Sequence, residues 1–159
     1  MKLPPAVVHP LLLVVAYVVT GKLGLLYAPG EGYASALFPP AGLAVAYAIV
    51  RGRQAFPWVL LGSFLLNVSP ELAALRPTPG GLAIAAGIAI ASALQAVFGG
   101  ALMRRALGAP FALETGRRAT TFFAVAIGTC IVAPTLATAL LLAAGAIAHA
   151  NAAFVWTTW

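Results

Sequence analysis

Two carboxamide side chains are the groups in this sequence best placed to do chemistry inside apolar surroundings. Asn67 and Gln95 both lie within long apolar runs. A carboxamide has two donor hydrogens and an acceptor oxygen, and in hydrocarbon these atoms need partners on a neighbouring helix or on a bound molecule. The sequence leaves both uses, helix packing and ligand binding, open for each residue.

Hydroxyl groups in the apolar runs are less informative. A serine or threonine can bond to the backbone of its own helix, and we expect this local bonding at Ser63, Ser92, Thr129 and Thr135. These four residues therefore give no separate indication of a binding site.

No arrangement of acids, histidines or cysteines in the sequence indicates catalysis. The chain has three acidic residues, two histidines and one cysteine, Cys130, and it has neither an HExxH motif nor a glycine-rich phosphate loop. A lone cysteine excludes an intrachain disulfide. We therefore expect no catalytic residue, no metal site and no cofactor in this chain.

The composition is that of a chain surrounded by lipid. It is 62% hydrophobic and 8% charged, whereas soluble domains carry roughly 25% charged residues. The formal net charge of +6 comes from short segments between apolar runs rather than from one soluble face, which argues against nucleic acid as a partner. We predict an all-α integral membrane protein, a polytopic helical bundle whose main partner is the lipid bilayer.

The apolar runs set the number of membrane spans. We predict five complete spans and the start of a sixth, with all 159 residues in a single domain that the sequence cuts within its last span. Ser69 and Pro70 are expected to start a short interfacial helix at residues 71–75, and Pro134 is expected to bend the fifth span. The predicted spans are residues 6–26, 33–50, 55–68, 82–103 and 119–144, followed by an unfinished segment at residues 154–159.

The Pro39-Pro40 pair makes the second span unusual. Each proline is tolerated in the first turn of a helix but not inside it, so a helix starts at about Pro40. From Pro40 to Val50 this helix has 11 residues, which cover only about half of a roughly 30 Å hydrocarbon core. Residues 33–38 must supply the remaining depth as irregular backbone, which needs cover from protein or a water-filled cavity. We therefore predict a half-helix that starts at Pro39-Pro40.

The half-helix leads to a hypothesis for a small-molecule site in the outer half of the bundle. The free N–H groups of its first turn and its dipole favour a carbonyl, carboxylate or phosphate group. Asn67 closes the third span on the same side, and Gln95 lies deeper. The candidate binding residues are Tyr33, Phe38, Pro39, Pro40, Gly42, Asn67 and Gln95.

Small residues recur on one face of the fourth predicted span. Gly87, Ala91 and Gly99 lie at intervals of four or eight positions, in register with Gln95. Small residues at this spacing allow helix backbones to approach closely in a membrane. We therefore expect this face to pack against another helix.

The basic residues predict the orientation of the chain. Seven fall on one side of the predicted topology, and only Lys22 and Arg76 fall on the other. Because loops rich in lysine and arginine stay in the cytoplasm, we expect a cytoplasmic N-terminus. The seven are Lys2, Arg51, Arg53, Arg104, Arg105, Arg117 and Arg118.

Residues 33–68, YASALFPPAGLAVAYAIVRGRQAFPWVLLGSFLLNV, carry a family resemblance. Their aromatic-Pro-Pro-Ala-Gly helix start and the following span that ends in asparagine resemble the first of the MASE families, which are bacterial membrane-associated sensor domains. The resemblance continues through GIAIASALQ at residues 87–95, LMRR at residues 102–105 and the closing FVWTTW. The sequence departs from the family at Phe38, where tryptophan is usual, and at Ser92, where asparagine is common, and these departures concern the ligand rather than the fold.

The resemblance implies an input domain in the bacterial inner membrane. In whole proteins of this kind the domain precedes a histidine kinase, a diguanylate cyclase or a similar module, so catalysis belongs to a downstream segment. It also implies a homodimer formed through the full-length protein, and a signal that the family leaves undefined.

Two other functions fit parts of the sequence. A substrate-binding membrane subunit of a vitamin transporter is similar in size, in its richness in alanine and glycine, and in an expected six spans. A purely structural assembly module would show no dependence on a ligand. Coding sequence for a kinase or cyclase downstream would favour the sensor.

Overall fold

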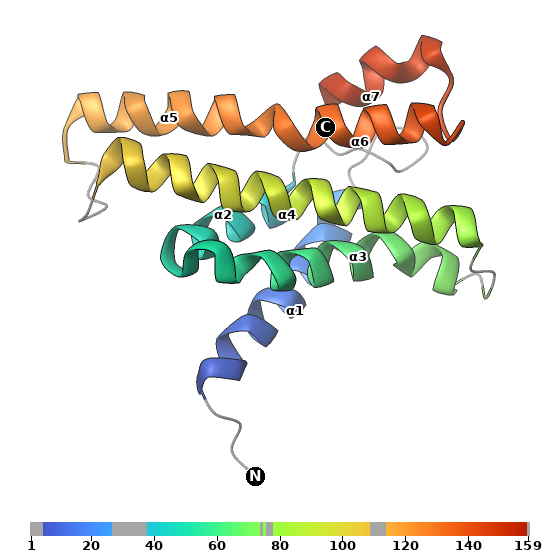
Figure 1. Ribbon diagram of the computed structural model, residues 1–159, viewed down its shortest axis with the longest axis horizontal. Helices are drawn as coiled ribbons and strands as arrows, with labels where there is room; N and C mark the ends of the chain where they lie inside the picture. The colour runs from blue at the N-terminus through green and yellow to red at the C-terminus, as the bar shows by residue number, and fades with distance from the viewer. Residues whose placement is uncertain (1–4, 27–37, 74, 76–77, 109–113, 159) are drawn as a thin grey trace.

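The computed structural model describes residues 5–26, 38–73, 75, 78–108 and 114–158 (Figure 1). Within these residues it contains helices and turns and no strand, which confirms the predicted all-α class. The elements are α1 (Pro5–Leu25), α2 (Pro39–Arg51), η1 (Gly52–Ala55), α3 (Phe56–Ala73), α4 (Pro79–Leu107), α5 (Gly116–Cys130), α6 (Val132–Ala143), η2 (His149–Asn151) and α7 (Ala152–Thr158).

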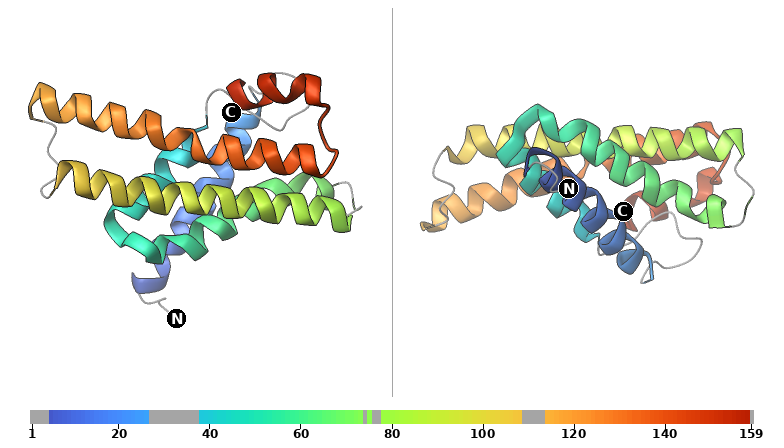
Figure 2. Two further views of the ribbon diagram at one scale, coloured as in Figure 1. Left: turned by 45° about the horizontal axis from the view of Figure 1, so that its top comes forward. Right: turned by 90° about the horizontal axis from the view of Figure 1, so that it is seen from below.

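The longest helix, α4, lies at the centre of the structure. It has 29 residues, and α2, α3, α5 and α6 all pack against it. The helices α5 and α6 follow one side of α4, α3 follows another, and α1 is inclined across α2 and α3 (Figures 1 and 2). The position of every other long helix is therefore set directly by α4 or through α2 and α3.

Three stretches of the described chain are long and apolar enough to cross a membrane. They are Val8–Leu25 in α1, Pro79–Leu107 in α4, and Gly116–Ala143, which combines α5 and α6. Helix α2 has only 13 residues and reaches about 20 Å. It starts at Pro39, which confirms the predicted helix start to within one residue. Helices able to span a membrane are thus confirmed, whereas the count of five spans stays a prediction.

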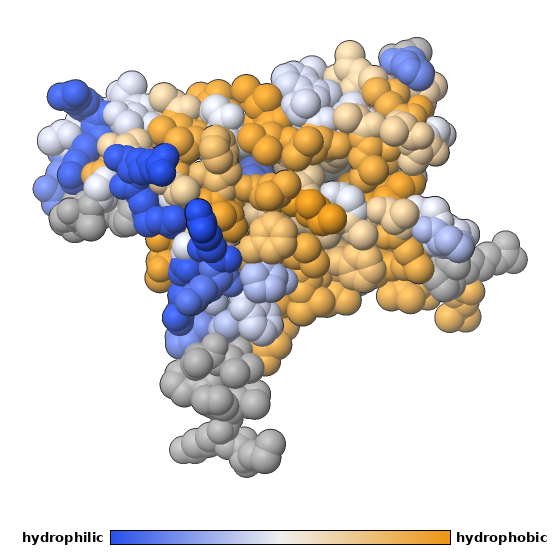
Figure 3. Space-filling model, viewed as in Figure 1, coloured by the Kyte–Doolittle hydropathy of each residue, from blue (hydrophilic) through white to orange (hydrophobic). Residues whose placement is uncertain are grey.

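The surface carries the pattern of a protein in a bilayer. Apolar side chains cover the middle of the face in Figure 3, and hydrophilic side chains gather at its left-hand end, over the end of α4, the start of α5 and the connection between α2 and α3. Large side chains such as Phe123 and Ile127 are 62% and 68% exposed. Exposure on this scale would be costly in water and is favourable against lipid.

The predicted interfacial helix at residues 71–75 is wrong. Helix α3 continues through Pro70 to Ala73, so Ser69 is not a helix cap. A proline inside a helix leaves the carbonyl four residues earlier without its donor, and here that carbonyl belongs to Leu66. The hydroxyl of Ser69 donates to the Leu66 oxygen at 2.8 Å, so a side chain replaces the missing backbone bond and the helix goes on.

The predicted fifth span is one apolar helical stretch, Gly116–Ala143, whose regular pattern breaks at Ile131 between α5 and α6. Ile131 keeps right-handed helical backbone angles, φ −76° and ψ −24°, so the break is a local loss of regular helical hydrogen bonding about one turn before Pro134. Pro134 has no N–H for the carbonyl of Cys130, and its ring crowds that carbonyl. The interruption therefore falls where the proline acts on the preceding turn, not at the proline itself.

Helix α2 is held at its C-terminal end by a charged side chain from α4. The Nη1 atom of Arg104 donates to the carbonyl oxygens of Ala48 and Ile49, the latter at 3.2 Å. These carbonyls lie in the last turn of α2, where cations stabilise the negative end of the helix dipole. Arg104 thus fixes α2 against α4 at the hydrophilic end.

Helices α2 and α4 approach each other closely at Gly100. A Cβ atom at this position would lie 2.8 Å from the carbonyl carbon of Ala48 and 3.0 Å from the nitrogen of Ile49. Both are backbone atoms, which have no rotamer to move away. Only glycine therefore fits here.

We predict that Gly100→Ala destabilises the protein by about 1–3 kcal/mol, because the added methyl forces α2 away from α4. The matched control is Gly128→Ala in α5, where an added Cβ meets nothing within 4 Å. The measurement is the melting temperature of each variant in detergent. Equal melting temperatures for wild type and Gly100→Ala would show that the two helices do not approach this closely.

Candidate functional site

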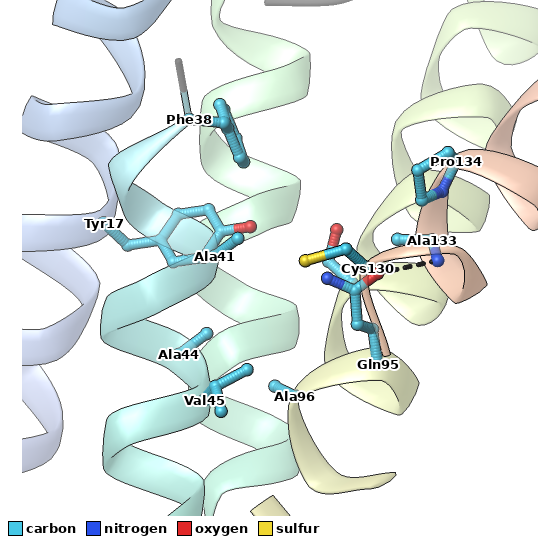
Figure 4. Close-up of a pocket in the computed structure, with 11 residues that line it drawn as sticks. Tyr17, Phe38, Ala41, Ala44, Val45, Gln95, Ala96, Cys130, Ala133 and Pro134 are labelled. Atoms are coloured by element: carbon cyan, nitrogen blue, oxygen red, sulfur yellow. Dashed lines mark hydrogen bonds between the residues drawn. The ribbon is translucent and has the colours of Figure 1, made fainter. Parts of the chain in front are cut away.

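A pocket of about 210 Å³ lies between α1, α2, α4 and the interruption between α5 and α6. Figure 4 shows its lining side chains converging from these elements. The space equals the volume of about seven water molecules at liquid density. The pocket is lined by Tyr17, Phe38, Ala41, Ala44, Val45, Ser92, Gln95, Ala96, Cys130, Ala133 and Pro134.

Gln95 binds the backbone where the two helices separate. Its Oε1 atom accepts a hydrogen bond of 2.8 Å from the N–H of Ala133 (Figure 4). In a continuous helix that N–H would bond to the carbonyl of Thr129. The side chain is 7% exposed, so its amide takes up a donor that the interruption leaves inside the protein. Gln95 therefore has the bridging role between helices that the sequence left open.

The same amide also faces the pocket. In Figure 4 the nitrogen of the Gln95 side chain is turned away from Ala133, towards the side of the pocket formed by Tyr17 and α2. A primary amide has two N–H donors. One end of the side chain is thus committed to the backbone while the other end borders the cavity.

Tyr17 closes the opposite side of the pocket. Its side chain is 1% exposed, and its hydroxyl lies close to the side chains of Ser63 and Ser92. Ser63 in turn donates to Ser92 across 3.2 Å. The Tyr17 ring meets Phe38 edge to face, with 6.2 Å between ring centroids. This group of hydroxyls joins α1, α3 and α4 beside the cavity.

Asn67 lies outside the pocket. Its Nδ2 atom donates to the backbone oxygen of Ser63 at 2.8 Å and to the Ser63 hydroxyl at 3.4 Å. The side chain is half-buried and bonded within its own helix. Asn67 therefore bonds to Ser63 within α3 and does not line the cavity.

The structure brings together part of the predicted site. Phe38 and Gln95 both line the pocket, and Pro40 is buried at the start of α2. Pro39 and Gly42 are exposed, and a Cβ on Gly42 would meet nothing within 4 Å. Tyr33 lies outside the described residues.

The array of free N–H groups on which that site was predicted is mostly absent. Pro39 and Pro40 have no N–H, and the N–H of Ala41 donates to the Phe38 oxygen at 3.1 Å. The prolines that start the helix thus remove the donors that would bind an anion. The pocket lies instead along the side of α2 that faces α4, at Ala41, Ala44 and Val45.

The predicted site does not include Tyr17, Ser92 or Cys130, which line the pocket. Tyr17 is the one tyrosine of residues 6–26, and a buried tyrosine hydroxyl needs a partner, which was an available signal. Ser63 and Ser92 were expected to bond within their own helices, but they bond to each other. Thr129 and Thr135 do bond locally, to Ala126 and Ile131, as predicted.

The small residues of α4 face α5 and α6. A Cβ on Gly87 would clash with a methyl group of Leu140, and one on Gly99 would lie 3.4 Å from Thr129. Ala91, between them, is 3% exposed. This face of α4 presses on both helices that flank the interruption, and it positions Ala133 for Gln95.

The chemistry of the pocket is polar and uncharged. Its polar groups are a phenol, an alcohol, an amide and a thiol, and no acidic or basic side chain lines it. This pocket suits a small neutral molecule that both donates and accepts hydrogen bonds, because a buried ion without a counter-charge is strongly disfavoured. Within the described residues no three acids, histidines or cysteines gather to hold a metal ion.

One comparison with known proteins gives a match. The family model named MASE1 matches residues 9–159, which is nearly the whole chain. No curated protein and no solved structure matches.

We predict that Gln95→Leu lowers the free energy of unfolding by about 1–3 kcal/mol, because it leaves the Ala133 N–H buried without an acceptor. The control is Asn67→Leu, which removes donors whose acceptor lies on the same helix, and its effect should be smaller. Melting temperatures in detergent compare the two. An equal or larger loss in Asn67→Leu would mean that the Ala133 N–H has another partner.

Proposed function

The chain belongs to the MASE1 family, a membrane-associated sensory domain of signalling proteins, and from this premise we propose that it is the input domain of a histidine kinase or a diguanylate cyclase. Catalysis would then belong to a module downstream. We further propose that the signal is a small neutral molecule that binds in the pocket at Gln95. The family match favours this function over the vitamin-transporter subunit.

The single observation that carries the proposal is the placement of the pocket at the interruption between α5 and α6. A bound molecule would contact Ala41 on α2, Gln95 on α4, and Ala133 and Pro134 at the start of α6. Pro134 weakens the connection between α5 and α6 because it removes a helical hydrogen bond. The angle of α6 relative to α5 therefore depends on the contacts of α6 with α4. A ligand that changes those contacts therefore changes the position of α6.

The hydrogen bond of Gln95 offers a way to couple binding to this movement. A ligand hydroxyl can donate to Gln95 Oε1 in competition with the N–H of Ala133, and a ligand carbonyl can accept from the side-chain nitrogen of Gln95. The ligand shifts the arrangement of the helices only to the extent that it binds one arrangement more tightly than the other. Helices α6 and α7 are the last described elements, and they are in contact, so a change in α6 reaches the C-terminal end of the chain.

The proposed topology has five spans, a cytoplasmic N-terminus and a position in the inner membrane. The support for this orientation is the gathering of arginines at one end of the described structure. The C-terminal end of α2, η1, the end of α4 and the start of α5 carry Arg51, Arg53, Arg104, Arg105, Arg117 and Arg118. Basic segments of this kind remain in the cytoplasm. We also propose that the full-length protein forms a homodimer.

We predict that Ala41→Leu changes the signalling output of the full-length protein, because the larger side chain fills the space that the ligand needs. The control is Gly42→Leu on the next residue, which faces away from the pocket into open space. The measurement is the kinase or cyclase activity of membranes that contain equal amounts of each variant. If Ala41→Leu responds to the native stimulus like wild type, the pocket is not the sensing site.

We predict that a cysteine at Gly80 reacts with an impermeant thiol reagent added outside the cell, and that a cysteine at Gly116 does not. Gly80 lies at the start of α4 and Gly116 at the start of α5, so they mark opposite ends of the bundle. Cys130 is exposed and is first replaced by serine. Labelling of Gly116→Cys but not of Gly80→Cys would reverse the proposed orientation.

A further inference from the structure

A second cavity, of about 320 Å³, lies on the outer face of α4 beside η1 and the start of α3. We propose that this groove binds an anionic phospholipid from the membrane leaflet that meets the hydrophilic end of the protein. The groove is lined by Arg53, Phe56, Leu94, Val97, Phe98, Ala101, Leu102 and Arg105. It shares no lining residue with the pocket at Gln95.

The apolar part of the groove suits an acyl chain. Leu94, Phe98 and Ala101 follow one another on the same face of α4, because residues three and four apart align on a helix. Leu94 is 46% exposed and Phe98 is 52% exposed. Phe56 adds an apolar wall from the start of α3. A chain lying here covers apolar surface from both helices.

The charged part of the groove suits a phosphate group. Arg53 comes from η1 and Arg105 from the last turn of α4, and both side chains are exposed at the same end of the groove lining. Within the described residues neither guanidinium forms an ion pair or a hydrogen bond. Two guanidinium groups at one site provide the forked donors that bind phosphate oxygens.

The neighbouring Arg104 differs from Arg53 and Arg105, because its side chain does not line the groove. Arg104 is used within the protein, where it binds the carbonyls of Ala48 and Ile49. Arg105, one position along the helix, points to the groove instead. No acidic side chain lines the groove, so a lipid phosphate would supply the counter-charge that its two arginines lack there. Basic sites between helices near the cytoplasmic surface bind anionic head groups in this way.

A lipid in this groove would connect the α2–α3 turn to α4. Arg53 lies in η1, which directly follows α2, and α2 forms one wall of the pocket at Gln95. The head group would thus hold the hydrophilic end of α2 in place together with Arg104.

The test measures the retention of phosphatidylglycerol and of phosphatidylcholine by the intact 159-residue protein with native mass spectrometry. The variant is Arg53→Gln with Arg105→Gln. The control is Arg51→Gln with Arg117→Gln, which removes the same charge from exposed arginines of the same end that do not line the groove. The spectra report the bound lipid and the oligomeric state together.

We expect the groove variant to lose about thirtyfold in its preference for phosphatidylglycerol, as two arginines near a charged head group would give, while the control keeps most of that preference. An equal loss in both variants would overturn the proposal in favour of diffuse surface charge. An unchanged preference in both would also overturn it. A change of oligomeric state in the groove variant, without a change in lipid preference, would show that a second copy of the chain covers the groove.

Discussion

The hydrogen bond between Gln95 and the N–H of Ala133 is the interaction on which the rest of this structure depends. Pro134 interrupts the helical hydrogen bonding about one turn earlier, at Ile131. The interruption leaves the N–H of Ala133 without its usual backbone acceptor. In apolar surroundings such a donor is costly unless another group accepts its hydrogen. Gln95 on the central helix supplies that oxygen and so ties the start of α6 to α4. The cavity lies beside this bond because two helices diverge there, and the candidate site is a direct consequence of the interruption.

Polar contacts also connect neighbouring helices elsewhere in the bundle. Tyr17, Ser63 and Ser92 connect α1, α3 and α4, and Arg104 connects α4 to the end of α2. Lipid chains are as apolar as the helix surfaces, so burial of apolar groups does little to drive the helices together. Close approach at small residues and these hydrogen bonds provide the specificity instead. Each of these groups of contacts includes a residue of α4, which explains why the other helices are arranged around that helix.

Local chemistry could be predicted from the sequence, and contacts between distant residues could not. The start of α2 at Pro39 follows from the fixed backbone geometry of proline, and the alignment of Gly87, Ala91 and Gly99 follows from helix periodicity. The continuation of α3 through Pro70 depends on one rotamer of Ser69, and the Ala133 N–H finds its acceptor 38 positions earlier in the chain, at Gln95. Phe38 and Gln95 were found because prolines and amides are conspicuous in apolar runs. Tyr17 and Ser92 were missed because their roles exist only when α1, α3 and α4 are assembled.

The most direct test of this account detects the central hydrogen bond itself. A nuclear magnetic resonance experiment can measure the scalar coupling across a hydrogen bond, between a donor nitrogen and the carbonyl carbon of its acceptor, in the labelled protein in detergent. The account predicts a coupling between the amide nitrogen of Ala133 and the side-chain carbonyl carbon of Gln95. A coupling from Ala133 to the backbone carbonyl of Thr129 would contradict it, because it would show one continuous helix with no interruption for a ligand to act on.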